Sequence, residues 1–169
     1  MRTLIAATLF LVGAAAVCGQ PTGKFESKEG KFGAVFPQPP TASAKTAGGQ
    51  TLYLVHLTAD KDKSGYLITY SDLPAEAVKA PKPEQVLESS VNEFVERFKA
   101  KEATKSKALT FGPKKYAARE FTTEGPALTA RGTLVLVGNR LYQICVYGPK
   151  EFVEGKDADA FLASFEITQ

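Results

Sequence analysis

Apolar side chains recur at helical spacing between residues 86 and 98. They are Val86, Leu87, Val91, Phe94, Val95 and Phe98, and charged or amide side chains occupy most of the positions between them. Apolar residues at intervals of three and four form a stripe along one side of an α-helix. The pattern therefore predicts a long helix packed on a sheet, and the lysines between residues 101 and 105 suit the negative end of its dipole.

β-Branched and aromatic residues dominate seven other segments, which are predicted to be strands. Three precede the helix, at residues 31–36, 51–58 and 66–71, and four follow it, at 108–111, 116–123, 128–137 and 140–147. Gly138 and Asn139 separate the last two and tolerate the backbone angles of a two-residue hairpin turn. Residues 134–137 and 144–146 are apolar without clean alternation, which predicts central strands covered on both faces.

A second, shorter helix is predicted at residues 157–165, with Asp157 as its cap, and it would cover the other face of the sheet. Prolines 37, 39 and 40, followed by a stretch rich in Ala, Thr, Ser and Gly, predict a flexible connection over residues 41–50. The element order is then βββαββββα. The predicted fold class is α+β, a mostly antiparallel sheet of about seven strands flanked by one long and one short helix.

This order resembles the Mog1/PsbP-like α/β sandwich. The Phe36-Pro37 end of the first strand, the strand at 66–73 that enters the long helix, and the sequence FLASF at 161–165 carry the resemblance. More narrowly, NRLYQ at 139–143 together with FLASF is similar to uncharacterised exported proteins of planctomycete-type bacteria. The resemblance covers nearly the whole mature chain, and none of its motifs is catalytic. It implies a binding, assembly or envelope protein and names no ligand.

The N-terminus has the features of a secretory leader. Arg2 precedes an apolar run at residues 4–17 that ends in small residues and is too short to cross a bilayer. We expect residues 1–18 to be a signal peptide, 19–30 a tether and 31–169 a single α+β domain, exported to the periplasm or the extracellular space. Lipidation of Cys18 is an alternative to cleavage after Ala16, although Ala15 and Val17 depart from the usual lipid-attachment pattern.

Composition and charge narrow the range of functions that this chain is expected to have. A chain with 44% hydrophobic and 23% charged residues is ordinary for a globular protein. The net charge is +3 and the lysines are interspersed with acids, so nucleic-acid binding is not expected. Cys145 lies in an apolar strand segment, which predicts a small buried hydrophobe rather than a reactive thiolate. A disulfide with Cys18 requires that Cys18 remain in the mature chain.

No cofactor or metal is predicted. Residues 60–65 fit the opening of a calcium loop, but Ser71 stands where a bidentate acid is needed, so a solvated hairpin turn is the favoured interpretation. His56 is the only histidine, and no metal-binding spacing accompanies it. A packed or surface position in a strand is therefore expected for His56.

The candidate ligand-binding residues are Arg119, Glu120, Arg131 and Tyr142. Arg119 and Arg131 form a fork for an anionic ligand if their strands are neighbours and both side chains point to the same face. The alternative is a cross-strand ion pair between an arginine and Glu120 or Glu124. Tyr142 either lines a groove or packs in the core.

The sequence favours a non-enzymatic domain of the cell envelope that binds or assembles a protein or small-molecule partner, through an exposed region of its sheet or through residues 41–50. One alternative is an envelope hydrolase that uses His56 with carboxylates such as Asp72, Glu120 or Glu124. A second alternative is a structural protein anchored by a lipid on Cys18.

Overall fold

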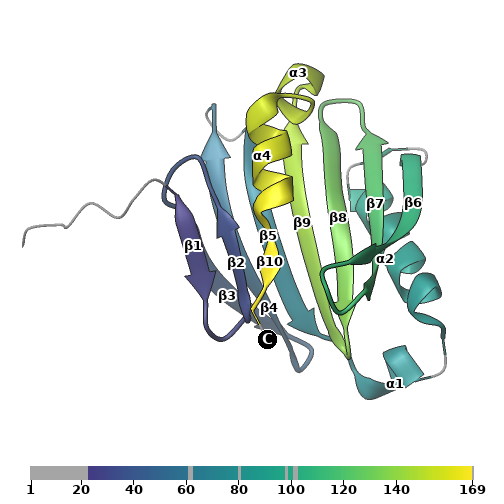
Figure 1. The fold of residues 1–169 in the computed structure, drawn as a ribbon. Coiled ribbons are helices and arrows are strands. Elements are labelled where there is room, and N and C mark those ends of the chain that lie inside the picture. Colours follow the sequence, from purple (N-terminus) through teal and green to yellow (C-terminus); the bar gives the residue numbers. More distant parts are fainter. Residues whose placement is uncertain (1–22, 61–62, 80, 98, 101–102, 169) are drawn as a thin grey trace, which may run out of the picture.

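The computed structural model describes residues 23–60, 63–79, 81–97, 99–100 and 103–168 (Figure 1). The predicted signal peptide with Cys18 lies outside these residues, and so do residues 19–22 of the predicted tether and residues 61–62 of the 60–65 turn. The described strands form two sheets, and helices pack on the larger one.

Seven antiparallel strands form the main sheet, in the order β3-β4-β5-β9-β8-β7-β6. The strands are β3 (Thr41–Ala47), β4 (Gln50–Ala59), β5 (Ser64–Asp72), β6 (Ala103–Phe111), β7 (Tyr116–Glu124), β8 (Thr129–Val137) and β9 (Arg140–Gly148). The predicted seven-stranded antiparallel sheet and its α+β class are confirmed. The hairpin between β8 and β9 is also confirmed, since Val137 pairs with Arg140 across the turn and Gly138 has a positive φ.

The prediction of a flexible connection at residues 41–50 is wrong. β3 pairs with β4 along its whole length, from Thr41 opposite His56 to Ala47 opposite Gln50. The turn between them is Gly48-Gly49, where φ is 59° and 78°. Two successive positive φ angles are costly for residues with a Cβ and suit a tight hairpin. The Ala, Ser and Lys residues of β3 have little strand propensity of their own, so the pairing with β4 decides its conformation.

A second, three-stranded sheet packs on one face of the first. It consists of β1 (Lys24–Ser27), β2 (Phe32–Val35) and β10 (Glu166–Ile167), in the order β1-β2-β10. The predicted tether at residues 19–30 is therefore wrong over Lys24–Ser27, which pair with β2. The predicted strand at 31–36 is real but lies in this small sheet, and β3 takes the seventh place in the main one.

Helices cover both faces of the main sheet (Figure 1). The described helices are α1 (Ala75–Lys79), α2 (Pro83–Arg97), α3 (Lys150–Val153) and α4 (Lys156–Ser164). α2 and α4 confirm the predicted long and short helices, while α1 and α3 are too short to give a periodic pattern in the sequence. Gly155 occupies the N-cap of α4, so the expected capping role of Asp157 is wrong. Lys105, expected near the end of the long helix, lies in β6.

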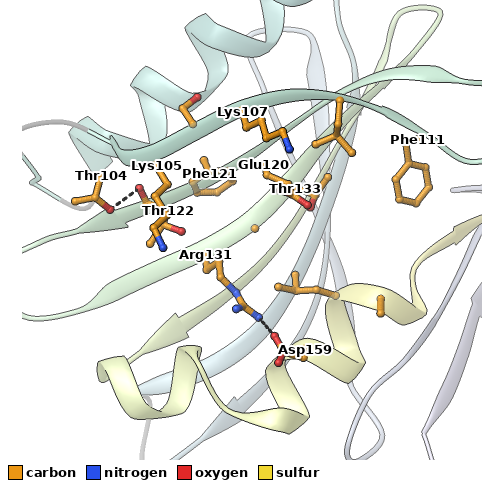
Figure 2. A pocket seen from close by; sticks show the side chains of 15 residues that line it. Thr104, Lys105, Lys107, Phe111, Glu120, Phe121, Thr122, Arg131, Thr133 and Asp159 are labelled. Carbon is orange, nitrogen blue, oxygen red and sulfur yellow. Dashed lines mark hydrogen bonds and ion pairs between the residues drawn. The ribbon is translucent and has the colours of Figure 1, made fainter.

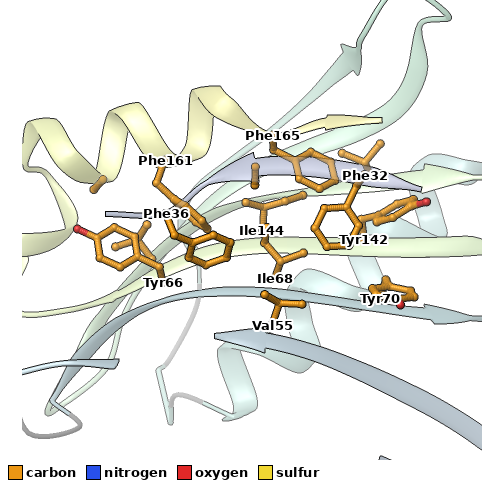
Figure 3. Packing of buried hydrophobic residues seen from close by; sticks show 14 of the residues in the cluster. Phe32, Phe36, Val55, Tyr66, Ile68, Tyr70, Tyr142, Ile144, Phe161 and Phe165 are labelled. Carbon is orange, nitrogen blue, oxygen red and sulfur yellow. The ribbon is translucent and has the colours of Figure 1, made fainter. Parts of the chain in front are cut away.

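The hydrophobic core has two parts, one on each face of the main sheet. The first lies between that sheet, the small sheet and α4, and Figure 3 shows Phe32, Phe36, Tyr66, Ile68, Tyr142, Ile144, Phe161 and Phe165 within it. The second lies under α2 and contains Leu87, Val91, Phe94, Phe121, Leu134 and Cys145. The central strands β8 and β9 are thus buried on both faces, as predicted.

Cys145 is fully buried in the part of the core under α2. Desolvation raises the pKa of its thiol to about 12, so the thiolate is scarce at neutral pH. A thiol in this state packs as a small hydrophobe and has little nucleophilic reactivity.

Arg140 at the start of β9 joins three segments of the fold. Its Nε and Nη2 donate to the two carboxylate oxygens of Asp72 at 2.7 and 2.8 Å, and its Nη1 donates to the carbonyl oxygen of Glu29 at 2.9 Å. The guanidinium also lies 5.4 Å from the ring centre of Tyr70. The bidentate bond to Asp72 joins the ends of β5 and β9, and the bond to Glu29 holds them against the loop between β1 and β2.

Replacing Asp72 by Asn should lower the free energy of unfolding by up to about 1 kcal/mol at pH 7, because the Asp72 side chain is half-exposed. The bond to Arg140 lowers the pKa of Asp72 in the folded state. Its stabilisation is therefore complete above the unfolded pKa, near 4, and is lost as the pH falls through the lowered folded pKa. Urea unfolding of wild type and D72N should show a difference that shrinks below about pH 4. The exposed Glu88, changed to Gln, is the matched control, and an equal loss there would contradict the assignment.

Candidate binding groove

A groove of about 920 Å³ lies between α4 and the β6–β8 end of the main sheet (Figure 2). Its lining comes from β6, β7, β8 and α4, and consists of Thr104, Lys105, Ser106, Lys107, Leu109, Phe111, Glu120, Phe121, Thr122, Arg131, Gly132, Thr133, Asp159, Leu162 and Ala163. The groove is partly open to solvent, and we name it the β6–α4 groove. A smaller hollow of about 260 Å³ begins beyond Phe111, between Tyr116 and Ile167.

Strand alternation sets which side chains face α4. Successive residues of a strand point to opposite faces, so every second residue of β6 faces the groove: Lys105, Lys107, Leu109 and Phe111. The register places Glu120 of β7 opposite Lys107, and Arg131 of β8 opposite Thr122. Charged and apolar groups from three successive strands are thereby brought to one surface.

α4 supplies the other wall. Asp159, Leu162 and Ala163 lie three and four residues apart, which places them on one side of the helix. The Asp159 carboxylate accepts a hydrogen bond from Nη2 of Arg131, as the dashed line in Figure 2 shows. This ion pair links the N-terminal half of α4 to β8.

The lysines of the groove are not neutralised within the described part of the chain. Lys105 and Lys107 are exposed, and neither forms an ion pair with a described residue. The lining contains three cationic groups against the carboxylates of Glu120 and Asp159, and Asp159 is already paired with Arg131. The groove therefore has positive charge available for an anionic group.

The structure brings two of the four candidate residues together. Glu120 and Arg131 both line the groove, on the face that carries α4. Arg119 points to the opposite face of β7, where its Nη1 donates to Oγ of Ser106 at 3.0 Å. The fork of Arg119 and Arg131 is therefore wrong. Tyr142 is fully buried, and its hydroxyl donates to the carbonyl oxygen of Gly30 at 2.7 Å.

The expected cross-strand ion pairs are wrong as well. Arg131 pairs with Asp159 of α4 rather than with a glutamate of β7. Glu124 lies 3.7 Å from the ammonium of Lys150, at the start of α3. Arg131 and Glu124 are thus each paired with a residue of a neighbouring helix.

The residues suggested for a hydrolase do not converge. His56 on β4 and Glu120 on β7 are separated by β5, β9 and β8, about 19 Å across the sheet at the usual strand spacing. Asp72 and Glu124 lie at opposite ends of the sheet, since Asp72 pairs with Arg140 whereas Glu124 pairs with Thr129. Asp72 lies five residues beyond Leu67, the partner of His56 in β5, about 17 Å along the strand, so none of these carboxylates forms an acid–base pair with His56.

The sequence analysis missed Lys105, Lys107 and Asp159. The signal that was available is the alternation Lys105, Lys107, Leu109, Phe111, which gives one face of a strand a charged half and an apolar half. That signal was hidden because residues 101–105 were assigned to the end of a helix.

The described residues hold neither a metal-binding cluster nor a membrane-spanning helix. They contain no group of three or more His, Cys, Asp or Glu side chains placed to hold a metal ion. None of the described helices is long and apolar enough to span a membrane.

Comparison with known proteins supports the fold. The structure is similar to the solution structure of cyanobacterial PsbP (CyanoP) from Synechocystis sp. PCC 6803, with a TM-score of 0.59 and 8% identity over 92% of this chain and 98% of that one. The chain therefore has a PsbP-like α+β fold, as the resemblance in its sequence predicted. Neither the protein-family models nor the sequences of curated proteins give a match.

Proposed function

We propose that this protein is an exported, non-enzymatic binding domain of the cell envelope, and that its partner is a protein held in the β6–α4 groove. The observation that carries the proposal is the groove itself, an open surface with two unneutralised lysines beside apolar side chains. Binding sites typically combine apolar lining with a few polar groups that fix orientation. The dispersal of the candidate catalytic residues gives no comparable support to a hydrolase.

Export is supported by the leader features of residues 1–18 and by the similarity of residues 139–143 and 161–165 to exported proteins of planctomycete-type bacteria. Lipidation of Cys18 remains the alternative to cleavage. Mass spectrometry of the protein purified from the envelope distinguishes a chain that begins after residue 16 from one acylated on Cys18, and a full-length chain in the cytoplasm would contradict export.

Site-specific photocrosslinking tests the groove. A photoreactive amino acid at Leu109, within the groove, should give a discrete adduct with a protein partner in intact cells. The matched control is the same amino acid at Leu52, which is 40% exposed on β4 and lies far from the groove. An adduct at both positions, or at Leu52 only, would contradict the location, and the absence of any adduct would contradict a protein partner.

A further inference from the structure

The β6–α4 groove changes in character from one end to the other. Lys105 and Lys107 of β6 lie at the end where Arg131 meets Asp159, whereas Leu109 and Phe111 follow on the same face. α4 runs in the same sense, with Asp159 first and Leu162 and Ala163 after it. Both walls therefore pass from charged to apolar in one direction.

We propose that the groove binds an extended acidic peptide segment of a protein partner, with its carboxylates over Lys105 and Lys107 and an apolar side chain against Leu109, Phe111 and Leu162. This inference rests on the proposed function and names the chemistry of the partner. Oppositely charged groups steer the segment to the charged end, and burial of its apolar side chain contributes at the other end.

The dimensions of the groove fit an extended segment. Lys105 and Phe111 are six residues apart in β6, which corresponds to about 20 Å of strand. A peptide of about six extended residues spans the same distance. Its alternate side chains then face the floor of the groove at the spacing of the β6 side chains that form it.

The lining favours a peptide over an acyl chain. An acyl chain is stabilised by burial of most of its surface in an apolar pocket. This groove is open, and its apolar part is limited to Leu109, Phe111, Leu162 and Ala163. Thr122 and Thr133 lie beside the charged residues on the groove face, and their hydroxyls both donate and accept hydrogen bonds. Peptide amides and carboxylates provide matching groups.

Glu120 affects where along the groove an acidic residue of the peptide is attracted most strongly. It lies opposite Lys107 in the middle of the groove, with no ion pair to a described residue, and its carboxylate repels a second carboxylate placed beside it. The strongest attraction for an acidic residue is therefore at Lys105. We therefore expect a carboxylate over Lys105 to contribute more to affinity than one over Lys107, which lies opposite Glu120.

Fluorescence anisotropy with labelled heptapeptides tests the inference on the mature domain. The first peptide has three glutamates followed by serine, leucine, serine and phenylalanine; the second lacks the apolar residues, and the third has lysines in place of the glutamates. At low salt the first should bind about tenfold more tightly than either of the others, and its affinity should fall as NaCl is raised, because the ion pairs are screened. Equal binding of the first and third peptides would overturn the inference.

Substitutions inside and outside the groove test where the peptide binds. The double variant K105Q/K107Q should lose about tenfold in affinity for the first peptide and none in thermal stability, because both lysines are exposed and unpaired. L109S should lose affinity while keeping the salt dependence. The control K45Q removes the only lysine of β3, at the opposite edge of the sheet, and should leave binding unchanged. An equal loss in K45Q would overturn the inference.

The outcomes separate this inference from the proposed function. A crosslinked partner at Leu109 without preference for the acidic peptide would overturn the peptide chemistry and leave the binding domain standing. Peptide binding that depends on Lys105 and Lys107, without any crosslinked protein in cells, would support the groove chemistry and contradict the proposed function. Fluorescent oleate that binds the groove while the first peptide does not would overturn the inference in favour of a lipid.

Discussion

Replacing Phe161 by alanine should lower the free energy of unfolding by about 3–5 kcal/mol, the usual cost of removing a buried aromatic ring. Phe161 of α4 is 1% exposed. Its ring centre lies 4.9 Å from that of Phe36 and 5.1 Å from that of Tyr66, so its loss leaves a cavity between α4, the end of β2 and the main sheet (Figure 3). The aromatic neighbours are held by the rest of the core and cannot collapse fully into this space.

Chemical denaturation monitored by circular dichroism measures the effect of F161A. Leu52→Ala is the control, because Leu52 is 40% exposed and its truncation leaves no enclosed cavity. We expect the control to stay within about 0.5 kcal/mol of wild type. A loss in F161A no larger than that of the control would show that α4 does not close this part of the core.

Replacing Gly132 by valine should cost about 3 kcal/mol, because its side chain has no room. A Cβ added at Gly132 would lie 2.2 Å from the carbonyl oxygen of Ile144 and 3.1 Å from the ring of Phe121. The oxygen belongs to the backbone of β9, so relief of the clash requires that β8 and β9 move apart at the centre of the sheet. Movement there would disturb the hydrogen bonds between the two strands and the packing of α2.

The matched control for G132V is Gly33→Ala in β2. A Cβ at Gly33 would meet the side chain of Glu166 at 3.1 Å, and that flexible side chain is half-exposed and can move. We expect a change below about 1 kcal/mol in G33A. Thermal melts of both variants measure the difference, and equal melting temperatures would contradict the role assigned to Gly132.

The fold could be predicted where local pattern and tertiary structure agree. The apolar stripe of α2 and the Gly138 turn are properties of neighbouring residues, and both are confirmed. β3 was missed because its Ala, Ser and Lys residues carry no strand pattern, and only the pairing with β4 makes it a strand. β1 was missed for the same reason, since its pairing with β2 defines it.

The groove could not be predicted because it depends on strand register. Thr122 pairs with Arg131, so odd-numbered residues of β7 pair with even-numbered residues of β8. Arg119 and Arg131 are both odd-numbered, and they therefore point to opposite faces. One residue more or fewer in the connection between the strands could reverse this outcome. The same uncertainty hid the meeting of Lys105 and Lys107 with α4.

The position of β2 has a consequence for the order in which the domain is completed. β2 lies between β1 and β10, and Phe32 pairs with Ile167, 135 positions later in the chain. The ring of Phe165 also packs 5.5 Å from Phe32 and 5.7 Å from Tyr142. A nascent chain that has not yet reached Phe165 leaves the rings of Phe32 and Tyr142 without this partner, so this part of the core closes only after synthesis has passed Phe165.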